Sequence, residues 1–242
     1  KITEIGIAIP GTVNQNKIIK SVNLGLKDYN IVDAINKEIN LPIKIRNDAK
    51  CAALAENKYG ALKKYNRILF MTLGTGIGGA VIINGNLLET GEYPGCEFGH
   101  MVIKENGLKC NCGRKGCFEK YGSMRAFKDN LRNELGLEDK TSGKELMAIL
   151  KDTTKESKDY AKIEKVRKQY IRDLSVGIAN LVNIFEPEAI GIGGSFVYFS
   201  EVLLQDVKET ILKEDMLFNP RKEINIQTAV LGNEAGIIGA TL

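Results

Sequence analysis

The most diagnostic segment of this chain reads Glu97-Phe98-Gly99-His100 and, ten residues after this histidine, Cys110-Asn111-Cys112-Gly113-Arg114-Lys115-Gly116-Cys117-Phe118-Glu119. The segment holds three cysteines and the only histidine of the sequence. Three thiolates and one imidazole form a closed tetrahedral shell, which suits a structural zinc ion because no coordination position is left for water. Glycines at 113 and 116 allow the tight turns that bring the sulfurs together. We therefore predict a metal site made of His100, Cys110, Cys112 and Cys117.

Strand and helix patterns alternate on both sides of this segment. Before it, the patterns predict strands at 2–9, 41–45, 67–73 and 80–83, a helix at 31–39, and a helix from Asn47-Asp48 to Tyr59. A hairpin turn is expected at Asn84-Gly85. After it, we expect mostly helix over 119–185, strands at 189–192 and 224–228, and helices at 201–212 and from about Asn233 onward. This alternation is typical of the α/β class.

The composition narrows the range of functions. The 242 residues are 43% hydrophobic and 26% charged, as in ordinary globular proteins, and no apolar run is long enough to cross a membrane. The net charge of +4 comes from bases interleaved with acids, which is not the pattern of a nucleic-acid-binding surface. Five cysteines in a chain of this length do not suggest a disulfide framework. Cys51 and Cys96 lie outside the cluster and are interpreted as packing residues. We therefore expect a reducing, cytoplasmic location.

Several polar and glycine-rich positions have both a chemical and a structural interpretation. Asp48 could accept a proton in catalysis, or Asn47-Asp48 could only cap a helix. Glu97 and Glu119 could bind a ligand or be surface charges, and His100 could be a plain structural residue. The turn at Gly74-Thr75-Gly76-Ile77-Gly78-Gly79 could cradle phosphate through its backbone amides or be a glycine-rich hairpin. Gly193-Gly194-Ser195, between a strand and a helix, is typical of a nucleotide-binding helix N-terminus.

Taken together, these motifs resemble the ROK family of bacterial sugar kinases and repressors. The resemblance rests on six motifs: Pro10-Gly11, Asn47-Asp48, Gly74 to Gly79, Glu97-x-x-His100, the Cys-x-Cys-Gly-x-x-Gly-Cys-x-Glu segment and Gly191-Ile192-Gly193-Gly194-Ser195. It implies an actin-like ATPase (ribonuclease H-like) fold, with two lobes and an interdomain cleft. The expected boundaries are 1–66 for a smaller N-terminal lobe, completed by a helix at 233–242, and 67–232 for a larger lobe with the zinc loop. Family kinases begin with a strand and an Asp-x-Gly-Gly-Thr phosphate loop, and we expect this segment to be missing from the sequence.

The resemblance also implies roles for individual residues. Asp48 matches the catalytic base of the family's kinases. The positions that match its sugar site are Asn47, Glu97, His100 and Glu119, with Asn23 and Gly11 as weaker candidates. Gly74, Thr75 and Gly76 match the turn that contacts the terminal phosphates, and Gly193, Gly194 and Ser195 match the loop on the adenosine side. The implied cofactors are ATP, Mg²⁺ and a structural Zn²⁺.

The function implied by the resemblance is an ATP-dependent sugar kinase that phosphorylates the 6-hydroxyl of a hexose. Glucose is the first expectation and N-acetylmannosamine the alternative, because kinases for both share this set of residues. A different class, the sugar-responsive transcriptional repressor, stays open, since family repressors carry a winged helix-turn-helix before the same lobes. The expected partners are a sugar and ATP, with no membrane, and with nucleic acid only if such a winged helix precedes the chain. A homodimer is expected.

Overall fold

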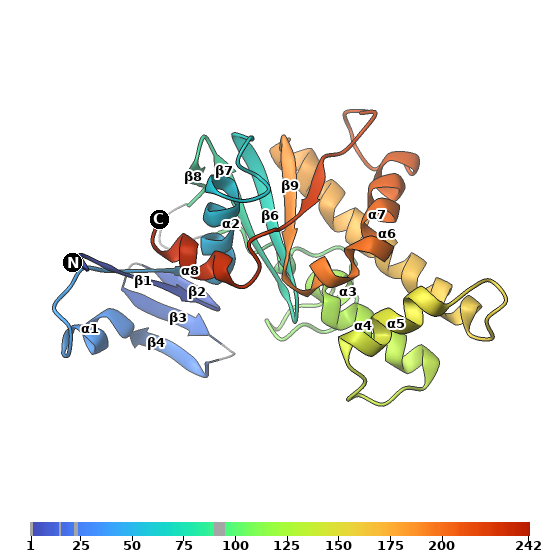
Figure 1. The fold of residues 1–242 in the computed structure, drawn as a ribbon, viewed down its shortest axis with the longest axis horizontal. Coiled ribbons are helices and arrows are strands. Elements are labelled where there is room, and N and C mark those ends of the chain that lie inside the picture. Colours follow the sequence, from blue (N-terminus) through green and yellow to red (C-terminus); the bar gives the residue numbers. More distant parts are fainter. Residues whose placement is uncertain (1, 15, 22–23, 90–94) are drawn as a thin grey trace.

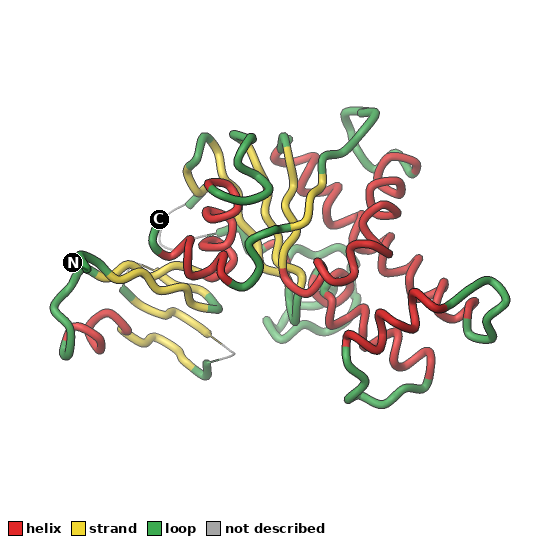
Figure 2. Tube along the Cα trace, viewed as in Figure 1, coloured by secondary structure: helices red, strands yellow, loops and turns green. Residues whose placement is uncertain are grey.

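The computed structural model describes residues 2–14, 16–21, 24–89 and 95–242, and it has the predicted α/β architecture (Figure 1). Three sheets are present: a parallel pair, a three-stranded antiparallel sheet and a mixed five-stranded sheet with the strand order β10-β9-β6-β7-β8. Strands lie at the centre and on the left of Figure 2, and most helices lie on the right. The molecule therefore has a smaller, strand-rich side and a larger side with a helical layer.

The small part contains the first two sheets and three helices. Its elements are β1 (Ile5–Ile9), β2 (Thr12–Asn14), β3 (Lys17–Ser21), β4 (Leu26–Asn30), α1 (Ile31–Asn36), β5 (Ile43–Asn47), α2 (Asp48–Lys58) and α8 (Glu234–Ala240). Strands β1 and β5 run parallel, so that Ile9 and Asn47 end side by side. Five apolar side chains form a small core between the two sheets: Ile9, Val13, Ile18, Val32 and Ile45.

The large part is built around the five-stranded sheet. Its elements are β6 (Arg67–Leu73), β7 (Ile77–Ile83), β8 (Asn86–Leu87), η1 (Phe98–His100), α3 (Glu119–Gly122), α4 (Met124–Leu135), α5 (Gly143–Asp152), α6 (Tyr160–Phe185), β9 (Ala189–Gly193), η2 (Gly194–Phe199), α7 (Ser200–Lys213) and β10 (Ile226–Thr228). Alternate residues of β6 point to opposite faces. Leu69, Met71 and Leu73 join the main core with the helical layer, whereas Ile68 and Phe70 join a second core that includes Ala53 of α2.

Helices α2 and α8 lie on the side of the small part that faces the five-stranded sheet (Figure 1). They can approach closely because glycine faces backbone at the contact. A Cβ added to Gly239 would lie 1.7 Å from the carbonyl oxygen of Cys51, and one added to Gly6 would lie 1.9 Å from that of Ala240. Any side chain at either position would therefore force α8 away from α2 or β1.

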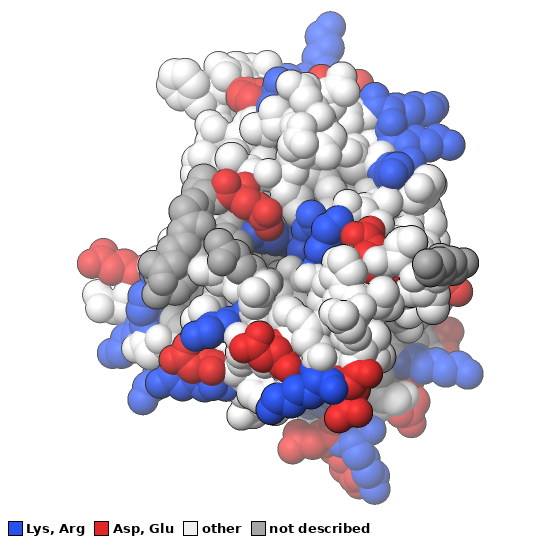
Figure 3. Space-filling view, turned by 90° about the vertical axis from the view of Figure 1, so that its left-hand side faces the viewer, with Lys and Arg blue, Asp and Glu red and all other residues white. Residues whose placement is uncertain are grey.

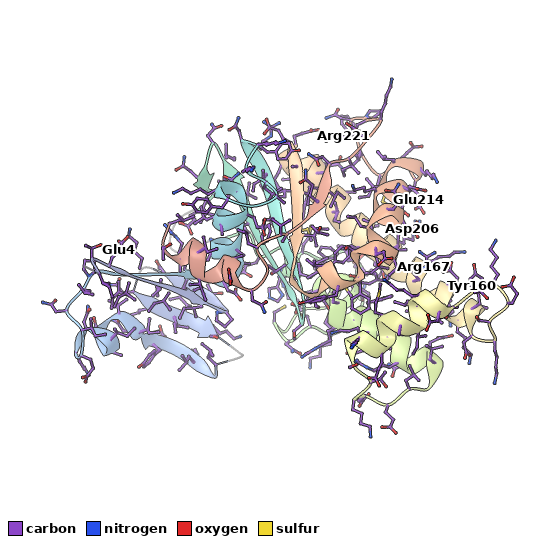
Figure 4. All side chains as sticks on the ribbon, in the orientation of Figure 1. Glu4, Tyr160, Arg167, Asp206, Glu214 and Arg221 are labelled. Carbon is purple, nitrogen blue, oxygen red and sulfur yellow. The ribbon has the colours of Figure 1, made fainter. Side chains whose placement is uncertain are left out.

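Ion pairs connect the outer helices of the large part. Arg167 of α6 pairs with Asp206 of α7 (Figure 4). Arg172 of α6 pairs with Glu214 just after α7. Among the described residues, no helix combines the length and the apolar character needed to span a membrane.

Most predicted elements are found, but several boundaries were wrong. The helix expected at 31–39 ends at Asn36, the strand expected at 80–83 begins at Ile77, and the last strand begins at Ile226. The hairpin turn at Asn84-Gly85 is confirmed, with both residues at positive φ. Strands β2, β3 and β4 were not predicted. Gly78 and Gly79 belong to β7, so the glycine-rich turn is only three residues long.

Candidate functional site

The predicted metal ligands are brought together in the structure. One ligand atom from each of His100, Cys110, Cys112 and Cys117 lies within 4.8 Å of all the others. The Sγ atoms of Cys112 and Cys117 are 3.6 Å apart, and Cys110 Sγ is 3.7 Å from His100 Nδ1. Sulfurs bound tetrahedrally to one zinc ion at about 2.3 Å lie about 3.8 Å apart. The cluster therefore has the donor types and the spacing that a structural zinc ion requires.

The local backbone gives the thiols different environments. A backbone N–H of Arg114 points at Cys112 and lowers the pKa of this exposed thiol. Burial raises the pKa of Cys110 and of Cys117. The guanidinium of Arg114 also donates to the backbone oxygen of His100 across 2.7 Å, which ties the two ends of the loop together. Binding of a metal would therefore release protons from the two buried thiols.

Glu119 connects the metal cluster to the glycine-rich turn. Its Oε1 accepts from Cys110 Sγ at 3.1 Å and lies 4.0 Å from His100 Nδ1. Its Oε2 lies on the other side, only 2.7 Å from where a Cβ on Gly76 would be. A side chain at position 76 would displace this carboxylate, so the turn and the metal loop are in direct contact.

Asn47 and Asp48 lie where β5 ends and α2 begins. The Oδ1 of Asn47 accepts from the backbone N–H groups of Ala49 and Lys50 at 3.0 and 3.2 Å, which is the geometry of a helix cap. Its Nδ2 donates to the backbone oxygen of Gly11 at 2.9 Å, and this bond fixes the loop after β1. The structural interpretation of Asn47 is thus realised, and Gly11 is held beside it.

Asp48 lies on the open side of this helix start. The residue is solvent-exposed, yet neighbouring protein atoms desolvate its carboxyl and raise the pKa above the ordinary value of 3.8. A hydrogen bond from the backbone of Ala49 acts in the opposite direction and is the smaller effect. Ala49 also packs against β7, since a Cβ on Gly78 would lie 2.9 Å from its methyl carbon. The first turn of α2 is therefore seated beside the strand that follows the glycine-rich turn.

The two glycine motifs meet at one edge of the five-stranded sheet. Strands β6 and β9 are parallel, so Leu73 and Gly193 lie at the same edge. Gly194 has φ of +74°, and a Cβ there would lie 2.6 Å from the oxygen of Leu73. Ser195 Oγ donates to the same oxygen at 3.5 Å, and Thr75 is exposed. The expected order of strand then helix holds, with the 3₁₀ helix η2 placed before α7.

Two predicted site residues are less well defined. Glu97 precedes η1, is exposed and makes no side-chain capping bond. The next residue, Phe98, is buried, and its ring lies 2.1 Å from a Cβ placed on Gly79. Asn23 lies outside the described residues. The structure thus joins the turn at Gly74 to Gly76 to the metal cluster through Glu119, and it seats Ala49, the residue after Asp48, on Gly78 of the following strand.

Lys50 was missed by the sequence analysis. It is 3% exposed, two residues after Asp48, and its Nζ lies 3.3 Å from Glu89 Oε1. The available signal was a charged residue among alanines on the apolar side of a helix, three positions before the buried Ala53. Lys50 holds the segment after β8 against α2, next to the predicted base.

A groove of about 480 Å³ lies elsewhere, between α6 and α7 (Figure 4). It is lined by residues of these helices, including Lys168, Arg172 and Glu209, and by none of the predicted site residues. Several of its charges are paired, Arg172 with Glu214 across the groove and Lys213 with Glu209 within α7. On the face in Figure 3, basic and acidic side chains are mixed and form no continuous basic surface.

Comparison with known proteins extends these observations. A glucokinase of Halalkalibacterium halodurans is 32% identical over 249 residues, covering 97% of this chain and 74% of that protein. A xylose repressor of Bacillus spizizenii is 31% identical over 208 residues, covering 86% of this chain and 52% of the repressor. A ROK family glucokinase of Streptomyces griseus, solved with glucose and AMPPNP, superposes with a TM-score of 0.78 at 26% identity, covering 99% of this chain and 80% of that one.

These likenesses agree with the motifs and with the fold. The architecture is that of the actin-like ATPases, as the sequence predicted. The model of the ROK family matches residues 1–242, and the chain therefore belongs to the ROK family.

Proposed function

We propose that this protein is an ATP-dependent sugar kinase that transfers the γ-phosphate of ATP to the 6-hydroxyl of a hexose, with glucose as the first substrate. The observation that carries the proposal is that Glu119 contacts both the turn at Gly74 to Gly76 and Cys110, while Ala49, the residue after Asp48, packs on Gly78 of the strand that follows this turn. A phosphoryl acceptor bound beside Asp48 would lie between a base and a phosphate-binding turn.

Asp48 is assigned as the general base. Such a base accepts the proton of the attacking hydroxyl and contributes about 10²–10⁴-fold to the rate. The raised pKa of Asp48 brings its basicity closer to neutral pH, which favours proton acceptance once the carboxyl is ionised. Asp48 makes its one observed side-chain bond to the adjacent backbone, so an oxygen stays available for a sugar hydroxyl.

The sugar is assigned to a set of polar groups around Asp48. These are Asn47, Glu97, His100, Glu119, Gly11 and Asn23. Carboxylates and amides select sugars because an analogue that lacks a hydroxyl leaves a polar group unpaired. The remaining N–H of the Asn47 amide is the hydrogen available to a ligand, since its other contacts are used within the chain.

ATP is assigned to the two glycine motifs. Gly74, Thr75 and Gly76 would face the terminal phosphates, and Gly193, Gly194 and Ser195 would face the adenosine side. Magnesium would neutralise phosphate charge during transfer. The contact between Ser195 and Leu73, one residue before the turn, supports a single nucleotide site shared by both motifs.

Zinc is assigned to His100, Cys110, Cys112 and Cys117. When bound, it supplies no chemistry beyond holding the loop, because its four ligands leave no open position. His100 and Glu119 would then be fixed in orientation toward the sugar. A reducing compartment such as the cytoplasm would keep these thiols available for the metal.

In this proposal the kinase has two lobes, one formed by residues 1–66 with 233–242 and the other by residues 67–232. The substrates bind between the lobes. We also propose that the protein is a homodimer. The tight packing of α8 on α2 and β1 supports the assignment of the C-terminal helix to the smaller lobe.

The test is ADP release by the full-length protein with ATP and Mg²⁺, across glucose, N-acetylmannosamine, N-acetylglucosamine, mannose, fructose and allose. Turnover with glucose and little with the others is the expected result. Turnover with N-acetylmannosamine instead would correct the substrate and keep the reaction. Sugar binding without turnover on any of them would refute the kinase.

A sugar-responsive repressor is the second candidate. It is favoured by the 31% identity to a xylose repressor, over 86% of this chain. A repressor needs the sugar site and no catalytic base, so the presence of Asp48 argues for the kinase. Binding of the full-length protein to its own upstream DNA, released by sugar, would decide for the repressor.

A further inference from the structure

Glu56, in the third turn of α2, is a fully buried carboxylate whose partners are all backbone N–H groups. Its side chain is 0% exposed. One oxygen, Oε1, accepts from Val230 N and Leu231 N, both at 2.8 Å. The other, Oε2, accepts from Ala61 N at 2.9 Å. Three donors on two oxygens satisfy the carboxylate and join α2 to two segments that are far apart in sequence.

Those two segments are the passages of the described chain between the small and large parts. Residues 59–66 lead from α2 in the small part to β6 in the large part. Residues 229–233 lead from β10 in the large part to α8 in the small part. One buried side chain therefore binds both connections, beside the interface where α2 and α8 pack together.

The first passage is shaped to receive this carboxylate. A Cβ on Gly60 would lie 2.0 Å from Glu56 Oε2 and would expel it from its place beside Ala61. The backbone oxygen of Glu56 also accepts from Gly60 N at 3.1 Å and from Leu62 N at 3.0 Å. Both the main chain and the side chain of this residue thus hold the turn that leaves α2.

We propose that Glu56 is a positioning residue that clamps the two interpart connections and thereby fixes the position of Asp48, at the other end of α2, relative to the five-stranded sheet. This inference rests on the proposed kinase function. Asp48 and Glu56 lie at opposite ends of α2, eight residues apart, which is about 12 Å along a helix axis. A tilt of about 5° at the clamp therefore moves Asp48 by about 1 Å, and a misplacement of about 1 Å can lower a rate about 100-fold.

The substitution Glu56→Gln tests the clamp with little change in volume. Glutamine has one oxygen and one NH₂ group, so it cannot accept hydrogen bonds on both sides. If its oxygen stays with Val230 and Leu231, its NH₂ faces the N–H of Ala61. The control is Glu188→Gln. Glu188 Oε2 also accepts from two backbone N–H groups, those of Asn66 and Arg67, but it is exposed and it contacts only one passage, at the end next to β6.

The measurements use the full-length protein and three readouts. Hydrogen exchange is followed at peptides covering 60–62 and 229–232. Small-angle X-ray scattering is recorded without ligands. Titration calorimetry measures glucose affinity with and without a non-hydrolysable ATP analogue. For Glu56→Gln we expect faster exchange in both peptides, a larger radius of gyration, and a coupling between glucose and nucleotide reduced about tenfold. Glu188→Gln should leave the scattering and the coupling as in the wild type.

Each outcome has one meaning. Faster exchange with unchanged scattering and unchanged coupling would show that Glu56 only stabilises its own turn, and the inference would be wrong. Equal effects of Glu56→Gln and Glu188→Gln on the coupling would also overturn it. If the wild type binds no glucose and phosphorylates no sugar, the proposed function fails, and scattering alone still decides whether Glu56 restrains the two parts. Gly60→Ala, which expels the carboxylate without altering it, must reproduce the scattering change.

Discussion

Replacing Asn47 by alanine should separate its structural contribution from the chemistry around it. The side chain makes three hydrogen bonds, two to the first N–H groups of α2 and one to the oxygen of Gly11. Loss of a helix cap costs about 1 kcal/mol. Loss of the bond to Gly11 costs about 1 kcal/mol more. We therefore expect Asn47→Ala to lower the free energy of unfolding by about 2 kcal/mol.

Asn47→Asp is the matched variant. A carboxylate keeps both acceptor bonds to the helix and is favoured at a helix N-terminus by about 0.3–1 kcal/mol. It has no hydrogen to donate to Gly11, so only that bond is lost. Its loss of stability should therefore be about 1 kcal/mol or less.

The assay is urea unfolding followed by circular dichroism, analysed by linear extrapolation, with thermal unfolding as a second measure. For a chain of this size about 2 kcal/mol corresponds to a fall of about 4–8 °C in the melting temperature. Equal losses for Asn47→Ala and Asn47→Asp would show that the cap contributes nothing and would refute this reasoning. Losses below about 0.5 kcal/mol in both variants would show that the bond to Gly11 also contributes nothing measurable, since ordinary surface substitutions change stability by that much.

Three further predictions follow from the site. Asp48→Asn should lower kcat at least about 100-fold with little change in glucose affinity, and unchanged turnover would exclude Asp48 as the base. Because desolvation raises the pKa of Asp48 above 3.8, the kcat of the wild type should fall on acidification at a higher pH than an ordinary aspartate would give. Cys112→Ser should lower the zinc content, measured by atomic absorption, and should also weaken glucose binding. Loss of zinc with normal glucose binding would show that the metal does not support the sugar site. Gly194 has φ +74°, and a Cβ there would lie 2.6 Å from the oxygen of Leu73. Gly194→Ala should therefore destabilise the protein by about 1–3 kcal/mol and raise the KM for ATP more than the KM for sugar. A variant with wild-type stability and KM values would show that a side chain at this position causes no strain.

The sequence predicted the large part better than the small part, for a physical reason. Strand β6 was predicted with its observed bounds because both of its faces are buried and its apolar run is uninterrupted. Strands β2, β3 and β4 were missed because they are short and carry few buried residues. β3, for example, has lysines at both 17 and 20, and only Ile18 and Ser21 are buried.

The sequence could propose the members of a site but not the contacts between them. The spacing of the cysteines was enough to predict the cluster of His100 with three thiols that the structure brings together, because chelation imposes a local pattern. The contact of Glu119 with Gly76 depends on how α3 packs beside the sheet, which no local pattern records. Gly79 looked like part of a phosphate turn, but its lack of a side chain makes room for the ring of Phe98. Glu56 resembles any solvated helix glutamate until the two passages of the chain close around it.

The packing of α8 has a consequence for the order of events during biosynthesis. Strand β1 and helix α2 leave the ribosome well before α8, the helix at Glu234–Ala240 that packs on both of them. Contacts over such sequence separations form slowly because a long loop must close first. The five-stranded sheet can form before α8 has been made, while the face of α2 around Cys51, which α8 later covers, is still exposed. A nascent chain would therefore expose the alanine-rich flank of α2 until residues 234–240 have been synthesised, and this interval is when a chaperone would have its best opportunity to bind.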